Sequence, residues 1–243
     1  ETEPHRGNIL YQGQDLTSLN PNELRPFRRQ MQMIFQDPFA SLNPRMTVGE
    51  TIAEPMVVHG ITDKSGASEK SVEILKKVGL TADYASRYPH ELSGGQRQRI
   101  GIARALAHEP NLIIADEAVS ALDVSIQAQV VNLMMELQEE FGLSYLFISH
   151  DMAVIERVCH RVAVMYLGEI VELGTRSQVF ENPKHPYTKK LMSAVPIADP
   201  KLRKKELNLM TDEIPSLVKP IGYEPEKIDL IKIEEGHFIK PYN

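Results

Sequence analysis

The feature that most constrains the fold is a short apolar run, residues 112–115, that leads directly into two acids, Asp116 and Glu117. Pro110 and Asn111 precede the run. A continuous apolar stretch between turn residues and charged residues is typical of a parallel strand buried on both faces. In open α/β sheets, ligands bind beyond the carboxyl ends of such strands. The sequence therefore predicts a parallel α/β sheet with Asp116 and Glu117 at its ligand-binding edge.

A second apolar run, residues 144–148, is followed by Ser149 and His150. If the two strands are neighbours in the sheet, His150 stands beside Glu117. For a nucleoside triphosphate, Asp116 is suited to hold Mg²⁺, directly or through water, and Glu117 to polarise the water that attacks the γ-phosphate. His150 is then a candidate for contacting that phosphate. An isolated acidic strand end or a single histidine is more often structural, so the interpretation depends on further motifs.

The next motif is Ser93-Gly94-Gly95-Gln96, which precedes a run with helical spacing of its apolar residues. Ser93 is a favourable N-cap residue, and glycines leave backbone N–H groups uncovered. The N-terminus of such a helix presents free donors and a positive dipole end, which suits a phosphate. An ordinary capped helix explains this short motif equally well when it is taken alone.

The order of these motifs resembles that of the nucleotide-binding subunits of ATP-binding cassette (ABC) transporters. The matching segments are residues 92–96 (signature motif), Asp116 and Glu117 (Walker B), residues 120–123 (D-loop) and His150 (H-loop). The resemblance covers roughly the whole chain. One departure is Ala118, where the family commonly has proline, and it leaves Glu117 in place.

The resemblance implies a fold and a set of roles. The fold is a P-loop NTPase-like α/β domain, with a RecA-like parallel sheet core and a small helical subdomain at about residues 40–95. Helices are expected near residues 47–52 and 68–78, and a helical insertion without a partner is the alternative interpretation of this region. The cofactors are ATP and Mg²⁺. The implied catalytic residues are Glu117, His150 and Gln36, the nucleotide-binding residues are Ser93, Gly94, Gly95, Gln96 and Asp123, and the metal-binding residues are Asp116 and Gln36.

Two of these roles come from the resemblance alone. Gln36 follows an alternating segment, residues 31–36, and matches the Q-loop glutamine that touches Mg²⁺ and the attacking water. That glutamine also reports ATP occupancy to the membrane subunit. Asp123 would contact the opposite protomer near its P-loop, and it also fits the N-cap position of the helix that follows.

The chain contains no Gly-x-x-x-x-Gly-Lys-Ser/Thr motif, and no Gly-Lys dipeptide occurs in it. In the family this P-loop lies upstream of the matching region, so the N-terminal part of the domain is expected to be missing. A helix N-terminus contributes about 0.3–2 kcal/mol to anion binding, whereas micromolar affinity needs about 8 kcal/mol. We therefore expect the Ser93 turn to close over ATP held by another subunit's P-loop, in a head-to-tail dimer. The chain alone is expected to be inactive.

Two domains are expected: the ABC ATPase domain at residues 1–195 and a C-terminal extension at residues 196–243. The extension contains six prolines and a basic cluster at residues 201–205, which predicts an extended arm. Together with residues 182–188, residues 88–91 and Ala118, it resembles the peptide-importer branch of the family. That branch handles dipeptides, oligopeptides, nickel or glutathione, and the match favours the oligopeptide or glutathione members.

Composition excludes several classes of protein. The net charge of −6 gives no support for nucleic-acid binding. A single cysteine, Cys159, excludes an internal disulfide framework and a four-cysteine metal site, and it suits a reducing cytosol. The eight histidines show no metal-ligand spacing. No apolar run approaches the ~20 residues that span a bilayer, and the N-terminus shows no signal peptide.

These observations favour an ATPase subunit that energises peptide import at the cytoplasmic face of the membrane. Its expected partners are a second ABC ATPase, membrane permease subunits and, indirectly, a substrate-binding protein. A soluble ABC ATPase acting on ribosomes or chromosomes is the first alternative, disfavoured by the acidic balance and by the lack of sustained heptads. A non-hydrolysing regulatory subunit is the second. Glu117 and His150 argue against it, but the missing P-loop leaves it open.

Overall fold

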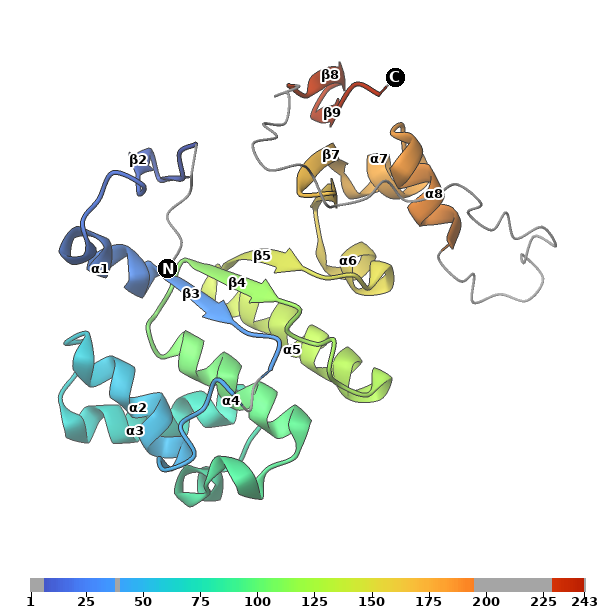
Figure 1. Cartoon of the computed structure of the whole chain (residues 1–243). Coiled ribbons are helices and arrows are strands. Elements are labelled where there is room, and N and C mark those ends of the chain that lie inside the picture. The colour runs from blue at the N-terminus through green and yellow to red at the C-terminus, as the bar shows by residue number, and fades with distance from the viewer. Residues whose placement is uncertain (1–6, 38–39, 195–228, 243) are drawn as a thin grey trace, which may run out of the picture. The chain divides into compact units, whose positions relative to one another are not determined.

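The computed structural model describes residues 7–37, 40–194 and 229–242. The chain divides into two compact units, Glu1–Asp151 and Met152–Asn243 (Figure 1). The two units meet at residues 151 and 152, whereas the sequence predicted a domain boundary at residues 195 and 196. That domain boundary remains a prediction. No helix in the described ranges is both long enough and apolar enough to cross a bilayer.

A three-stranded parallel sheet organises the first unit. Its strands are β3 (Met31–Ile34), β4 (Leu112–Asp116) and β5 (Ser144–Ile148), in the order β3-β4-β5. The central strand is the apolar run that precedes the two acids, and its Ile113 and Ala115 are fully buried. The parallel α/β sheet predicted from the sequence is therefore confirmed.

Two long helices alternate with the sheet strands along the chain. α4 (Gly94–Leu106) leads into β4, and α5 (Val124–Phe141) connects β4 to β5. The helical spacing of apolar residues between 126 and 141 predicts a stripe on α5, of which Val130, Leu133, Met134 and Leu137 are buried, whereas Ile126 is half-buried and Phe141 is exposed. It ends at Gly142, whose left-handed φ of 63° is suited to glycine at a helix C-terminus.

A group of helices lies between β3 and β4 in the sequence. It contains α2 (Val48–Val58), α3 (Lys64–Lys77) and two short 3₁₀ helices, Ala82–Ser86 and Pro89–Glu91, and it packs against α4 (Figure 1). Thr47 and Glu50 form a capping box that fixes the start of α2. The two helices expected in this region are thus present.

The segment before β3 forms a small hairpin and a helix. The hairpin pairs β1 (Leu10–Tyr11) with β2 (Gln14–Asp15). The helix α1 (Pro21–Gln30) leads directly into β3. Its start is set by Asn20 and Glu23, which form a capping box.

Three arginines of α4 connect this helix to the segments around it. Arg97 donates to the carbonyl of Pro89 over 2.8 Å, and Arg99 donates to the carbonyl of Val78 over 2.7 Å. Arg104 donates to the carbonyl of Ser41, in the segment that follows Gln36. Because a charged donor strengthens such bonds, α4 is held firmly within the helical group.

The first turn of α4 approaches α5 closely. A Cβ atom on Gly95 would lie 2.5 Å from Cγ2 of Ile126, whereas one on Gly94 would lie 3.7 Å from Cδ2 of Leu122. The first distance is a steric clash and the second is ordinary van der Waals contact. Gly95 is therefore required for helix packing, and Gly94 is not.

The second unit contains an antiparallel sheet together with short helices. α6 (Met152–Val158) precedes a hairpin of β6 (Arg161–Tyr166) and β7 (Glu169–Thr175), and α7 (Arg176–Glu181) and α8 (Pro186–Ala194) follow. Two further strands, β8 (Ile231–Glu234) and β9 (His237–Ile239), complete the order β6-β7-β9-β8.

The prediction of an extended arm was wrong for residues 231–239, because β9 pairs with β7 and β8 pairs with β9 in the same sheet. The chain returns to β7 from a distant position, and such non-local pairing leaves no local sequence signal. The predicted basic cluster at residues 201–205 lies outside the described residues.

A buried carboxylate fixes this second unit. Glu172 and His237 are both fully buried, and His237 Nε2 lies 2.7 Å from Glu172 Oε1. The same carboxylate accepts hydrogen bonds from the backbone N–H groups of Lys184 and His185, at 2.8 and 3.0 Å. Burial acts to raise the pKa of Glu172, but the hydrogen bonds outweigh it and hold that pKa below the usual value.

We expect Gly95→Ala to destabilise the chain by about 1–3 kcal/mol, because the new methyl group overpacks the contact with Ile126. Urea unfolding followed by circular dichroism measures the change. Gly94→Ala is the matched control and should stay within about 0.5 kcal/mol. Ile126→Ala should reduce the cost of Gly95→Ala when the two are combined; full additivity would contradict the packing argument.

We expect His237→Ala to lower the local stability of the β7–β9 pairing by about 1–3 kcal/mol, because it leaves a buried oxygen of Glu172 without its hydrogen-bond partner. Hydrogen exchange of the Lys240 amide, which donates to the carbonyl of Val171, reports on this pairing. Lys232→Ala removes only an exposed ion pair to Glu235 and serves as the control. Equal protection of the Lys240 amide in both variants would contradict the expectation.

The same pairing should weaken in acid. The folded pKa of Glu172 lies below its usual value of 4.5, so the stabilisation is complete above pH 4.5. It is lost as the pH falls through the folded pKa, since the unfolded chain then binds a proton that the folded one does not. We expect the protection factor of the Lys240 amide to fall on acidification below pH 4.5, and Glu172→Gln to remove that pH dependence.

Candidate functional site

The three predicted catalytic side chains meet in the first unit. Gln36 Nε2 donates to Glu117 Oε2 over 2.7 Å, and His150 Nδ1 lies 3.3 Å from Glu117 Oε1. Each residue lies within two positions of the end of a sheet strand, β3 for Gln36, β4 for Glu117 and β5 for His150. The parallel order of the strands places all three at the same edge of the sheet. The sequence thus predicted correctly that His150 lies beside Glu117, whereas the contact of Gln36 with Glu117 is found only in the structure.

The backbone of Glu117 is held in an unusual conformation. Its φ is 46°, in the left-handed region that costs a non-glycine residue about 1–3 kcal/mol. Its N–H donates to the carbonyl of Ile148 over 2.9 Å, and its own carbonyl accepts from Ser120 N–H and Ser120 Oγ. These bonds fix the direction in which the carboxylate leaves the sheet.

The cluster is open to solvent. The side chain of His150 is 72% exposed and that of Glu117 is 30% exposed. Even a full ion pair at such exposure contributes only about 0–1 kcal/mol to stability, so the contact between His150 and Glu117 contributes no more. The arrangement is therefore of little value to folding, and its accessible carboxylate and imidazole are free to act on a ligand.

Asp116 and Gln36 provide oxygen atoms of the kind that Mg²⁺ prefers. Asp116 is half-buried at the end of β4, and nothing in the described ranges hydrogen bonds to its carboxylate. Gln36 uses its Nε2 on Glu117, which leaves the amide oxygen for another partner. The described residues contain no group of three or more histidine, cysteine or acidic side chains that could hold a metal. This donor set fits a Mg²⁺ ion whose remaining ligands are phosphates and water.

At the start of α4, Ser93 and Gln96 form a reciprocal capping box. Gln96 N–H donates to Ser93 Oγ over 3.3 Å, and Ser93 N–H donates to Gln96 Oε1 over 2.9 Å. Gln96 Nε2 in turn donates to the hydroxyl of Tyr84. The side chain of Gln96, predicted as nucleotide-binding, is thus engaged within the chain. Among the described residues, no partner is found for the N–H groups of Gly94 and Gly95, so these two are available to an anion.

Asp123 precedes α5 and is exposed. Its side chain makes no capping hydrogen bond, so the N-cap role considered for it is not seen in this structure. Its carboxylate is accordingly presented to solvent at the start of the helix.

Some supporting residues have no sequence signal. Tyr84 contacts Gln96 from 12 positions upstream, and Gln127 Nε2 donates to Asp151 Oδ2 over 2.7 Å beside the histidine. Neither residue is part of a sequence motif with a recognisable spacing. Ser120 lies inside the matched D-loop segment, yet its bond to the carbonyl of Glu117 depends on the tight turn between them, which the sequence does not specify.

Comparison with known proteins identifies two families along the chain. Residues 1–120 match the family described as ABC transporter, and residues 171–222 match the oligopeptide/dipeptide transporter C-terminal region. A glutathione import ATP-binding protein, GsiA, from Pectobacterium atrosepticum is 57% identical over 237 residues. The match covers 98% of this chain and 38% of that protein. The chain therefore spans well under half the length of its curated relative.

Solved structures agree with the sequence matches. The dimeric structure of MJ0796, a bacterial ABC transporter cassette, is 30% identical, with a TM-score of 0.64, and the match covers 72% of this chain and 75% of that one. A post-hydrolysis dimer of MJ0796 bound to ADP and phosphate is 29% identical with the same TM-score and coverage. With the parallel sheet and the clustered Gln36, Glu117 and His150, these matches show that the chain belongs to the ABC transporter ATP-binding cassette family.

Proposed function

We propose that this chain is part of an ATP-hydrolysing subunit that energises the import of glutathione or related peptides. The observation that carries the proposal is the cluster of Gln36, Glu117 and His150 at the carboxyl ends of three parallel strands. The similarity to a glutathione import ATP-binding protein, and the match to a peptide-transporter C-terminal region, support the cargo class.

In the proposed mechanism, Glu117 accepts the proton of the water that attacks the γ-phosphate. Its backbone bonds to Ile148 and Ser120 hold the carboxylate in position, and Gln36 restrains Oε2 from the neighbouring strand. His150 then serves to contact the γ-phosphate from the other side of the carboxylate. When Mg²⁺ is bound, with Asp116 and Gln36 as its protein ligands, it neutralises charge on the phosphates.

The start of α4 acts on a nucleotide that is bound by another subunit. Two free amide donors and a helix dipole supply about 0.3–2 kcal/mol, which is far less than nucleotide affinity requires. Gly94 and Gly95 therefore close over a nucleotide whose phosphates are held by a P-loop outside these 243 residues. The exposed Asp123 contacts the opposite ATPase unit in the same head-to-tail dimer.

The same elements couple the nucleotide site to a membrane permease. α4 carries the phosphate-facing amides and is bonded through Arg104 to the segment that follows Gln36. Occupancy of the nucleotide site is thereby transmitted to the helical group at about residues 40–95. We place residues 1–195 in the ATPase domain and residues 196–243 in a C-terminal extension. The subunit acts at the cytoplasmic face of the membrane, with a substrate-binding protein delivering cargo to the permease.

The test uses the full-length protein with its permease, reconstituted in liposomes, and measures phosphate release and glutathione uptake together. We expect Glu117→Gln to lower both by about 10²–10⁴-fold while ATP binding persists, because the general base is removed and the phosphate contacts remain.

Glu136→Gln is a matched control, since Glu136 lies exposed on α5 away from the cluster. It should leave both rates unchanged. Phosphate release that persists in the Glu117→Gln variant would remove this residue from the proposed role. Normal hydrolysis stimulated by the permease without glutathione uptake would instead contradict the cargo assignment alone.

A further inference from the structure

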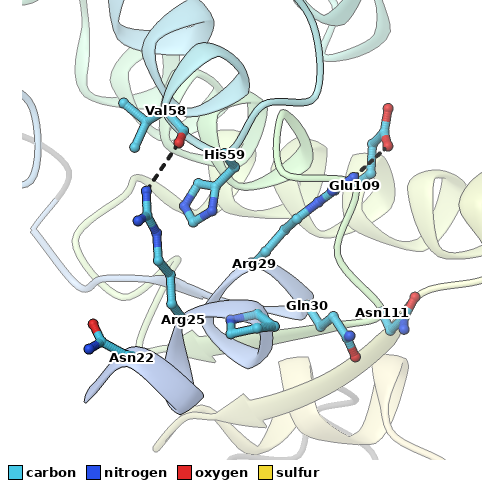
Figure 2. A pocket seen from close by; sticks show the side chains of 9 residues that line it. Asn22, Arg25, Arg29, Gln30, Val58, His59, Glu109 and Asn111 are labelled. Atoms are coloured by element: carbon cyan, nitrogen blue, oxygen red, sulfur yellow. Dashed lines mark hydrogen bonds and ion pairs between the residues drawn. The ribbon is translucent and has the colours of Figure 1, made fainter. Parts of the chain in front are cut away.

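Long-range side-chain hydrogen bonds of the first unit differ in where they lie. The bond from Arg25 to the carbonyl of Val58 borders an open crevice beside α1, is exposed and measures 3.3 Å (Figure 2). No residue of the catalytic cluster lines that crevice. The bond from Gln127 Nε2 to Asp151 Oδ2 is instead half-buried and measures 2.7 Å. It ends on the residue that follows His150, so a change in this bond acts directly beside the cluster.

The side chain of His150 is held only weakly by its own contact with the cluster. It is 72% exposed, and its Nδ1 atom lies 3.3 Å from Glu117 Oε1, which is a long contact. Contacts at such exposure restrain a side chain little. The direction of the imidazole is therefore set mainly by the backbone that carries it, from Ser149 to Asp151.

That short backbone segment is bonded at two points. Asp151 N–H donates to Ser149 Oγ over 3.0 Å, which closes a turn around His150. The carboxylate of Asp151 accepts the bond from Gln127 Nε2. Because a carboxylate only accepts, the amide nitrogen of Gln127 is the donor, and the charge on the acceptor strengthens the bond. The turn that carries the histidine is thereby bonded to α5.

Gln127 lies in the first turn of α5, just after the D-loop segment. Its N–H donates to the carbonyl of Asp123 over 2.8 Å, while its side chain reaches Asp151. The side chain is half-buried, and a hydrogen bond partly shielded from water is stronger than an exposed one. His150 is consequently placed relative to the start of α5 as well as to the end of β5.

We propose that Gln127 is a positioning residue for ATP hydrolysis, which acts through Asp151 to keep His150 directed at the γ-phosphate. The inference rests on the proposed ATPase function and adds a residue to its machinery. The role requires no contact between Gln127 and the nucleotide. Because a misplacement of about 1 Å can cost about 100-fold in rate, a single hydrogen bond at this turn is enough to affect catalysis.

The first test uses the full-length protein with its permease in liposomes and measures ATP hydrolysis over a range of ATP concentrations. Gln127→Leu approximately keeps the size of the side chain and removes the amide donor. We expect it to lower kcat by about 10–100-fold and to leave KM for ATP within about twofold, because the phosphates are still held while the histidine is displaced. Gln129→Leu makes the same change at an exposed position of α5 and should leave both constants unchanged.

A second measurement separates positioning from a general loss of structure. Residues that act as one unit have non-additive effects, so Gln127→Leu in the His150→Ala background should lower kcat by less than about twofold further. Single-turnover hydrolysis of radiolabelled ATP measures the low rates in this background. A residue that only stabilises the fold would lower the rate by the same factor in both backgrounds, and that result would overturn the proposal.

A third measurement needs no nucleotide. In the ¹⁵N-labelled chain, we expect Gln127→Leu to lower the backbone order parameters of His150 and Asp151 by at least about 0.1, because the turn loses its bond to α5. Gln129→Leu should leave both order parameters unchanged. Unchanged order in the Gln127→Leu chain overturns the proposed role.

These measurements distinguish failure of this inference from failure of the function on which it rests. If the unmodified full-length protein hydrolyses no ATP, the proposed function fails and this inference fails with it. If the unmodified protein hydrolyses ATP and Gln127→Leu does so with the same kcat, the role of Gln127 alone is overturned.

Discussion

The site depends on the register of three parallel strands. Ile34 of β3 pairs with Ala115 of β4, which pairs with Phe147 of β5. The carboxyl ends of the three strands therefore lie next to one another. The N–H of Glu117 then continues the ladder by donating to the carbonyl of Ile148. A shift of one residue in any strand would turn its side chains to the other face and separate Gln36, Glu117 and His150. Backbone hydrogen bonding thus sets the geometry of the cluster of Gln36, Glu117 and His150, while the contacts between these side chains add little to stability.

A second level of organisation joins the sheet edge to the helical group. α4 begins with two uncovered amides, packs on α5 through Gly95, and donates through Arg97, Arg99 and Arg104 to three separate segments. Arginine is suited to this task because its guanidinium remains charged while its stem packs along apolar surface. A displacement of this helix is therefore shared by the segment after Gln36 and by the 3₁₀ turn at Pro89. This arrangement gives a physical link between an anion at the amides and the surface formed by the helical group.

Sequence reasoning reached most of the first unit because its signals are local. The apolar run before Asp116, the stripe on α5 and the capping residue Ser93 each specify a structure within a few residues. The clustering of Glu117 with His150 followed from strand order alone. The return of β9 to β7 was missed because it joins positions far apart in the chain, and the buried contact of Glu172 with His237 depends on that return. The contact of Tyr84 with Gln96 likewise arises from tertiary packing that no sequence spacing records.

The conformation of Glu117 has a consequence for how this position tolerates substitution. A residue held at a φ of 46° is strained unless it is glycine or, to a lesser degree, asparagine or aspartate. Selection for thermal robustness alone would favour glycine at this turn. A glutamate here instead costs about 1–3 kcal/mol of folding free energy and presents a carboxylate in one fixed direction. Selection for heat resistance alone would therefore favour substitutions at this turn, and the resulting variants would have lost ATP turnover.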